Sequence, residues 1–333
     1  MITCRQSRGE YIGSFLFDRI LRKLLSISEK RRVGNLEFFI SPFDHIGQVI
    51  LTSGLYERHL LQSIGSIARR GGLGGGVVVD VGSNLGNHAV YLSTLFSKVV
   101  AFEPNPAVYK LLEANVLLNR RANIVTADFG LADRNGELEF FENQDGNLGG
   151  SGFLAPQSSG RYRTSRLKVR IGDEALAELM GPGEKVELMK IDVEGFEEQV
   201  LKGLRGTIAL HSPLVLFECG DAAQAKNVSS LLRDAGYTHF YSIEPKSYDY
   251  HAHPLKKVFD RLIYGADFHL RELTQFADKF YSLLLASKNG LAASPRPTGT
   301  CPSLWTSGRA SRLARGQSSW TSLSRYCPVA CDR

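Results

Sequence analysis

The chain has 333 residues, and its hydrophobic content of 43% is ordinary for a globular protein with a substantial core. The net charge of +6 comes mostly from residues 289–333, which hold six arginines and one acid, so the remainder is nearly neutral and a nucleic-acid-binding function is disfavoured. No apolar run approaches the roughly 18 residues of a membrane span, and the five cysteines show neither metal-ligand spacing nor a paired framework, so we expect a cytoplasmic protein without a bound metal.

An N-terminal segment, residues 1–70, precedes the predicted core. Residues 11–32 have the spacing of an amphipathic helix, and its apolar face carries Leu16, Ile20, Leu24 and Ile27. We expect this helix to pack on the core; the alternative is a surface that contacts an anionic membrane. Residues 35–52 alternate apolar and polar side chains and predict short strands, whereas residues 58–70 predict a helix.

Residues 77–103 are the centre of the predicted fold. An apolar strand ends at Asp80, a turn runs from Gly82 to Gly86, and an apolar helix leads to a second strand that ends at Glu103. Glycines let a ligand approach the main chain, and the helix N-terminus offers unpaired N–H groups. The pattern is typical of a nucleotide-cofactor site.

The residues of this turn discriminate between two cofactors. Asn84 stands where the dinucleotide fingerprint requires its middle glycine. Asp80 would repel a pyrophosphate but attract a ligand that carries an ammonium and a sulfonium. Glu103 could accept the ribose hydroxyls of either cofactor. S-adenosylmethionine is therefore favoured, and an NAD-dependent oxidoreductase is the alternative. His88 is a candidate cofactor contact or a packed helix residue.

Two segments after Glu103 are further candidates for the site. A third strand, residues 123–127, is followed by Asp128, which could accept the adenine amino group or be a solvated loop acid. A strand at residues 137–142 leads into residues 143–165, a loop rich in glycine and serine. We interpret this loop as a lid or acceptor-side wall, with a disordered insertion as the alternative.

A group of acids follows the fourth and fifth strands. Asp192 and Glu194 come directly after residues 186–191, and Glu218 ends the next strand. Parallel strands end at one edge of a sheet, so we expect these acids to face the methyl acceptor. They could supply a general base, bind a divalent cation or have a structural role. Lys190 can pair with one of them.

The C-terminal third completes the fold and then changes in composition. Residues 236–243 and 280–287 predict the last two strands, with a helix between them. The aromatic and histidine side chains of residues 247–254 suit a sugar-like acceptor or an ordinary surface loop. We place the catalytic domain at residues 71–288, and we interpret residues 289–333 as a disordered or aberrant tail. The oligomeric state is left open.

Several sequence blocks resemble one family. VDVGSNLGNH, AFEPNP, LMKIDVEGFE and LKGL occur in the order and spacing of the FkbM family of S-adenosylmethionine-dependent methyltransferases, and the likeness also takes in GLYE at residues 54–57 and the strand PLVLFE. The resemblance covers roughly residues 40–288. It implies an α/β Rossmann-like class I methyltransferase fold with a seven-stranded, mostly parallel sheet and helices on both faces.

The resemblance also carries expectations about function. It implies O-methylation of a hydroxyl on a glycan, glycolipid or secondary metabolite, with a small-molecule or glycan acceptor. It places residues 54–57 over the cofactor cleft, where Glu57 would orient a ligand amine or a neighbouring backbone group; a helix-start acid is the structural alternative. Asp-Val-Glu-Gly stands where amino-directed nucleobase methyltransferases carry Asp/Asn-Pro-Pro-aromatic, so a nucleobase nitrogen is disfavoured and no specific nucleic acid is expected.

Overall fold

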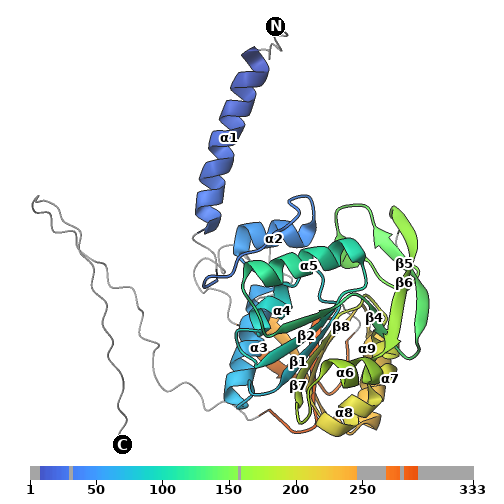
Figure 1. Ribbon diagram of the computed structural model, residues 1–333. Helices are drawn as coiled ribbons and strands as arrows, with labels where there is room; N and C mark the ends of the chain where they lie inside the picture. The colour runs from blue at the N-terminus through green and yellow to red at the C-terminus, as the bar shows by residue number, and fades with distance from the viewer. Residues whose placement is uncertain (1–7, 30–32, 157–158, 246–267, 278–280, 292–333) are drawn as a thin grey trace, which may run out of the picture. The chain divides into compact units, whose positions relative to one another are not determined.

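The computed structural model describes residues 8–29, 33–156, 159–245, 268–277 and 281–291 (Figure 1). The predicted acceptor loop at residues 247–254 lies outside the described residues, as do residues 292–333 of the predicted tail.

A central sheet of eight strands, in the order β10-β9-β11-β8-β7-β1-β2-β3, organises the described residues. The strands are β1 (Val77–Val81), β2 (Lys98–Phe102), β3 (Ile124–Ala127), β7 (Val186–Ile191), β8 (Leu214–Cys219), β9 (His239–Pro245), β10 (Phe268–Glu272) and β11 (Tyr281–Ser287). The run from β3 to β8 is parallel, and β11, β9 and β10 are joined by antiparallel pairs. The predicted α/β class with a mostly parallel sheet is thereby confirmed.

The central sheet of the described residues has one strand more than the seven that the sequence predicts, and the additional strand is β10. The sequence predicts a helix between the last two strands, but five residues of that segment pair with the outer edge of β9 from Phe268 to Glu272. Short edge strands carry little apolar periodicity because only a few side chains are buried, so this one is not visible in the sequence.

Helices cover both faces of the central sheet (Figure 1). One face packs on α3 (Arg58–Arg70), α4 (Asn87–Leu92) and α5 (Pro106–Leu118), and the other on α6 (Gly172–Leu179), α7 (Glu197–Gly203), α8 (Arg205–His211) and α9 (Ala222–Asp234). Strand β1 shows why both layers of helices form. Val77 and Val79 belong to the core on the side of α6 to α9, whereas Val78 belongs to the core on the side of α3 to α5. Alternating side chains of a strand point to opposite faces, so a strand with apolar residues on both faces needs cover on both.

A second, three-stranded sheet lies beside the parallel one, in the order β4-β6-β5. It is built from β4 (Gly130–Ala132), β5 (Gly136–Asn143) and β6 (Tyr162–Ile171), with the short 3₁₀ helix η1 (Leu148–Gly150) in the connection of β5 to β6. The predicted loop at residues 143–165 is therefore partly strand. Phe153 joins this connection to the rest of the fold, because its ring contacts those of Phe140 and Phe196.

The N-terminal segment contains two helices before α3. The prediction of short strands at residues 35–52 is wrong, because α2 (His45–Ser53) is a helix. The Asp44 side chain accepts a hydrogen bond from the Gly47 N–H, Ile46 and Ile50 are buried, and Gly54 ends the helix in the left-handed conformation. These are a side-chain N-cap and a glycine C-cap.

The first helix, α1 (Arg8–Glu29), occupies most of the segment predicted to be amphipathic. Its side chains at residues 14–23 are exposed, which differs from the packing that the apolar spacing of Leu16 and Ile20 predicts. No helix among the described residues is both long and apolar enough to cross a membrane.

Candidate active site

A cavity of about 390 Å³ opens at the carboxyl ends of β1, β2, β7 and β8. Besides the ends of β2, β7 and β8, its walls include the turn after β1, the segment before α3 with residues 56 and 57, and residues 147–153 in the connection of β5 to β6. Most of the predicted site residues line it, namely Glu57, Gly82, Asn84, His88, Glu103, Lys190, Asp192, Glu194 and Glu218. Ligands of parallel α/β sheets bind at this edge.

The turn after β1 is built on left-handed backbone. Gly82, Asn84 and Gly86 have φ angles of 79°, 49° and 90°, a region that glycine enters freely and asparagine tolerates. A Cβ on Gly82 would lie 1.9 Å from the carbonyl oxygen of Asp192, and one on Gly86 would lie 2.6 Å from the Leu112 side chain. These glycines are thus required by the packing of the turn, a reason different from the ligand approach that we predicted. Gly86 does not line the cavity.

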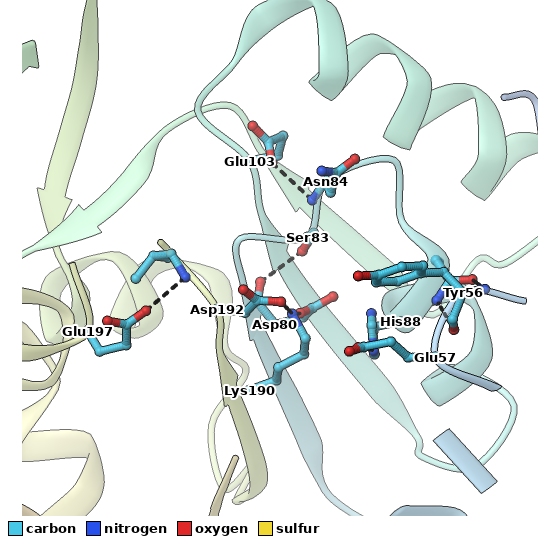
Figure 2. Close-up of polar contacts among 12 residues, drawn as sticks. Tyr56, Glu57, Asp80, Ser83, Asn84, His88, Glu103, Lys190, Asp192 and Glu197 are labelled. Atoms are coloured by element: carbon cyan, nitrogen blue, oxygen red, sulfur yellow. Dashed lines mark hydrogen bonds and ion pairs between the residues drawn. The ribbon is translucent and has the colours of Figure 1, made fainter. Parts of the chain in front are cut away.

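Glu103 fixes the other side of this turn (Figure 2). One carboxylate oxygen accepts the Asn84 N–H at 2.9 Å and the other accepts the Asn105 N–H at 2.8 Å. The side chain is buried, and burial raises its pKa to about 7. The hydrogen bonds from the two N–H groups favour the ionised form and lower the pKa, but their effect is smaller. A carboxylate has about four lone-pair sites, so each oxygen can still accept one hydroxyl from a ligand.

Asp80 does not form the floor of the cavity. It is completely buried and absent from the lining residues, and neither carboxylate oxygen has a hydrogen-bond partner in the part of the chain that the structure describes. The Lys190 ammonium lies 3.6 Å from its Oδ1, because Asp80 and Lys190 are register partners on adjacent strands (Figure 2). Lys190, in contrast, lines the cavity, and a cofactor contact of Asp80 stays a prediction.

Lys190 also organises the acids at the ends of β7 and β8. Its Nζ donates to Asp192 Oδ2 at 2.9 Å. Burial opposes the ionisation of Asp192, but the ammonium of Lys190 and a hydrogen bond from Glu218 outweigh it and hold the pKa of Asp192 well below its usual range. Burial and the Asp192 carboxylate raise the pKa of Glu218 far above neutral. At neutral pH the pair therefore consists of an ionised Asp192 and a protonated Glu218.

Glu194 completes the acidic group. One oxygen of each of Asp192, Glu194 and Glu218 lies within 4.8 Å of the others. Glu194 has a left-handed φ of 51° and is exposed toward the open cavity. Loss of surrounding water between the cavity walls, followed by the charges of Asp192 and Glu197, raises the pKa of Glu194 to about 7. The sequence prediction that the strand ends bring these acids together agrees with this geometry.

The segment before α3 contacts the Gly turn through Asn87, which the sequence analysis missed. Asn87 accepts the Tyr56 N–H at 3.1 Å and donates to the Tyr56 carbonyl at 3.0 Å. Glu57 has a left-handed φ of 49°, and its side chain does not cap α3. Its Oε2 instead lies 3.1 Å from Nε2 of His88, although Glu57 does stand at the start of α3, as the structural alternative has it. The signal available in the sequence was the polar residue directly after Gly86.

Residues 147–153 are the part of the predicted loop at residues 143–165 that lines the cavity. The buried Asp44 accepts the Leu148 N–H at 2.8 Å, and the His45 N–H donates to the Gly146 carbonyl at 3.0 Å, so α2 holds this segment over the cavity. Asp128, predicted to accept the adenine amino group, is exposed and does not line the cavity.

Comparisons with known proteins fit this site. Residues 80–239 match the family described as methyltransferase FkbM domain. Hexuronic acid methyltransferase AglP of Haloferax volcanii is 34% identical over 162 residues, which are 48% of this chain and 62% of that protein. Methyltransferase sdnD of Sordaria araneosa is 29% identical over 159 residues, which are 38% of this chain and 60% of that protein. The chain thus spans about three fifths of the length of these relatives.

Among solved structures, a methyltransferase FkbM from Methylobacillus flagellatus KT is similar with a TM-score of 0.36 and 15% identity, covering 80% of this chain and 59% of that one.

Proposed function

We propose, from the premise that residues 80–239 belong to the methyltransferase FkbM domain family, that this protein transfers a methyl group from S-adenosylmethionine to a hydroxyl of a glycan, glycolipid or secondary metabolite. The observation that carries the proposal is one cavity with two chemically distinct sides. The turn after β1 with Glu103 forms one side, and the acids that follow β7 and β8 form the other.

The first side fits the cofactor. Glu103 is buried beside the turn with unused lone pairs for the two ribose hydroxyls, and Asn84, which it orients, lines the same wall. Glu57 and the acidic group give the cavity an excess of carboxylates, which favours a ligand that carries an ammonium and a sulfonium. When bound, S-adenosylmethionine supplies an electrophilic methyl group.

The second side fits an acceptor hydroxyl, and Glu194 is its best general base. Asp192 is held by the Lys190 ammonium and Glu218 is protonated, so neither readily takes a proton at neutral pH. The pKa of Glu194, about 7, matches that task, because a base is most effective when its pKa lies near the working pH. Glu218 can orient the acceptor through hydrogen bonding.

Binding and turnover test the proposal separately. Calorimetry should register heat with S-adenosylhomocysteine and none with NAD. Purified protein with S-adenosylmethionine should then add one methyl group to a member of a panel of methyl glycosides, and mass spectrometry should detect the product. The panel should include uronic acid glycosides, because the relative in Haloferax volcanii is named for hexuronic acid. Absence of heat with both S-adenosylmethionine and S-adenosylhomocysteine would refute the cofactor assignment.

The variant Glu194→Gln tests the assignment of the base. It should slow methyl transfer about 100-fold or more and leave S-adenosylhomocysteine binding unchanged, because a general base contributes on that scale. In the unaltered protein the rate should rise with pH through about 7, the pKa of Glu194, and the variant should lack this rise. Glu139→Gln, which changes an exposed acid on β5, is the matched control. Equal rates in the two variants would exclude Glu194 as the base.

We also propose peripheral contact of α1 with anionic membranes, where a lipid-linked acceptor would be found. Its exposed apolar side chains include Leu16, Phe17 and Ile20, and Arg19 and Lys23 supply positive charge. Sedimentation with vesicles that contain phosphatidylserine should be weakened by Phe17→Glu but not by Leu210→Glu, which changes another exposed apolar side chain, on α8. Equal sedimentation of both variants would refute the contact.

A further inference from the structure

We propose that Glu197 and Gln224 are positioning residues, which together set the spacing between the two strand ends that carry the acidic group of the cavity. This inference rests on the proposed function, because it concerns the acceptor side of the same site. Neither residue lines the cavity. Both act through the backbone that presents Asp192, Glu194 and Glu218.

Glu197 holds the turn after β7. It is the first residue of α7 and is completely buried. Its Oε1 accepts the N–H groups of Val193 and Gly195, each at 3.2 Å, so one carboxylate oxygen spans the residues on both sides of Glu194. This turn needs support, because Glu194 and Gly195 have left-handed φ angles of 51° and 96°. A non-glycine residue in this conformation is strained and persists only where neighbouring contacts fix it.

Gln224 connects that carboxylate to the end of β8. It lies in the first turn of α9, which is capped by Asp221, and its side chain reaches back as in a capping box. Its Oε1 accepts the Gly220 N–H at 2.6 Å, and its Nε2 donates to Oε2 of Glu197. Gly220 is two residues beyond Glu218. A single chain of hydrogen bonds therefore runs from the backbone after Glu218 to the backbone around Glu194.

The donors and acceptors of this chain have a fixed order. Gly220 donates to the glutamine oxygen, the glutamine nitrogen donates to the carboxylate, and the carboxylate accepts two further N–H groups. A helix cap alone needs only a short polar side chain, and a buried carboxylate is costly unless it is fully hydrogen-bonded. The connection of two strand ends gives a reason for a buried Glu197 at this position.

Exchange of the two residues gives a sharp test of this order. In Glu197→Gln alone, two amide nitrogens would face each other, and in Gln224→Glu alone, two carboxylates would. The double variant Glu197→Gln/Gln224→Glu restores every donor and acceptor, because the new glutamine accepts from the turn and donates to the new carboxylate, which accepts from Gly220. Gln224→Met removes the connection without a change of charge, and Asn227→Ala, at an exposed position of α9, is the control.

The readout is the titration of the Glu194 and Glu218 carboxyl carbons, followed by NMR with ¹³C-labelled glutamate. Burial raises the pKa values of both acids, and the nearby Asp192 carboxylate raises them further. We expect Gln224→Met, which leaves the charge of the site unchanged, to shift the titration of Glu194 toward lower pH by about one unit, a tenfold change in proton affinity. The single exchanges also change the charge, so Glu197→Gln should shift the titration toward lower pH and Gln224→Glu toward higher pH. The double variant should return the titration close to that of the unaltered protein, and Asn227→Ala should show no shift.

Two results would overturn the inference: unchanged titrations of both carboxyls in Gln224→Met, or a double variant that recovers no more than the single ones. Calorimetry with S-adenosylhomocysteine on the same samples separates this inference from the proposed function. If the unaltered protein binds no S-adenosylhomocysteine, the proposed function fails, whereas the titrations still report on the spacing of the acids.

Discussion

Replacement of Lys190 by methionine should destabilise the protein strongly, because it leaves a carboxylate buried without an opposite charge. The Lys190 side chain is 2% exposed and that of Asp80 is 0% exposed, and their charged atoms lie 3.6 Å apart. Neither oxygen of Asp80 has a hydrogen-bond partner among the described residues. Removal of one partner of a buried pair costs about 3–5 kcal/mol. At about 2–4 °C per kcal/mol, the melting temperature should fall by roughly 6–20 °C.

A double variant separates the lost charge pair from the lost side chain. Lys190→Met/Asp80→Asn removes both charges, and replacement of a whole buried pair is often close to neutral, so this protein should recover at least about 2 kcal/mol. Asp192 loses the same partner but is 29% exposed, so water can solvate it. Urea unfolding followed by circular dichroism gives the free energies. A loss below about 1 kcal/mol in Lys190→Met, or a double variant as unstable as the single one, would refute this account.

Three further predictions follow from the site. Gly82→Ala should lower the free energy of unfolding in urea by about 2–5 kcal/mol, the sum of left-handed strain and a clash with the Asp192 carbonyl. Gly183 has the same φ of 79° and no neighbour within 4 Å, so Gly183→Ala should cost only the strain, about 1–2 kcal/mol. Equal costs would contradict the clash. Burial raises the pKa of Glu103 from 4.5 to about 7, so the stability that this carboxyl contributes is complete below pH 4.5 and is lost as the pH rises through 7. Glu103→Gln should therefore flatten the decrease in melting temperature between pH 4.5 and 7. An unchanged slope would contradict the raised pKa of Glu103. Asp44→Ala should lower the free energy of unfolding by about 1–2 kcal/mol and speed the hydrogen exchange of the Leu148 amide. Asp145→Ala in the same hairpin should leave this exchange unchanged. If the Leu148 amide stays protected in Asp44→Ala, α2 does not hold residues 147–153.

The parallel strands could be predicted from the sequence because both of their faces are buried. Residues 77–81 are all buried in the structure, and a run of valines that only Asp80 interrupts is close to the apolar pattern that such a strand requires. The glycine turn and the acids after β7 and β8 were predicted for a related reason, since residues that follow parallel strands necessarily meet at one edge of the sheet. The composition of the cavity was therefore largely readable from the chain.

The partners of individual side chains could not be predicted in the same way. The sequence does not reveal that β7 lies beside β1 in a register that sets Lys190 opposite Asp80. The helix α2 was mistaken for strands because it has only nine residues, too few to show a clear helical period, and its start depends on a single side-chain cap by Asp44. The contacts of Asn87 and Gln224 join segments far apart in the chain, so local spacing contains no trace of them.

The cavity wall at residues 147–153 belongs to the hairpin of β5 and β6 and is fastened to α2, whereas the turn around Asn84 and Glu103 belongs to the parallel sheet. Two structurally separate parts of the molecule thus enclose one cavity. An engineer could graft a different hairpin tip, keep Asp44 as its anchor and leave the turn around Asn84 and Glu103 untouched. Under the proposed function, such a graft would alter the acceptor side without any change in the residues proposed to hold S-adenosylmethionine.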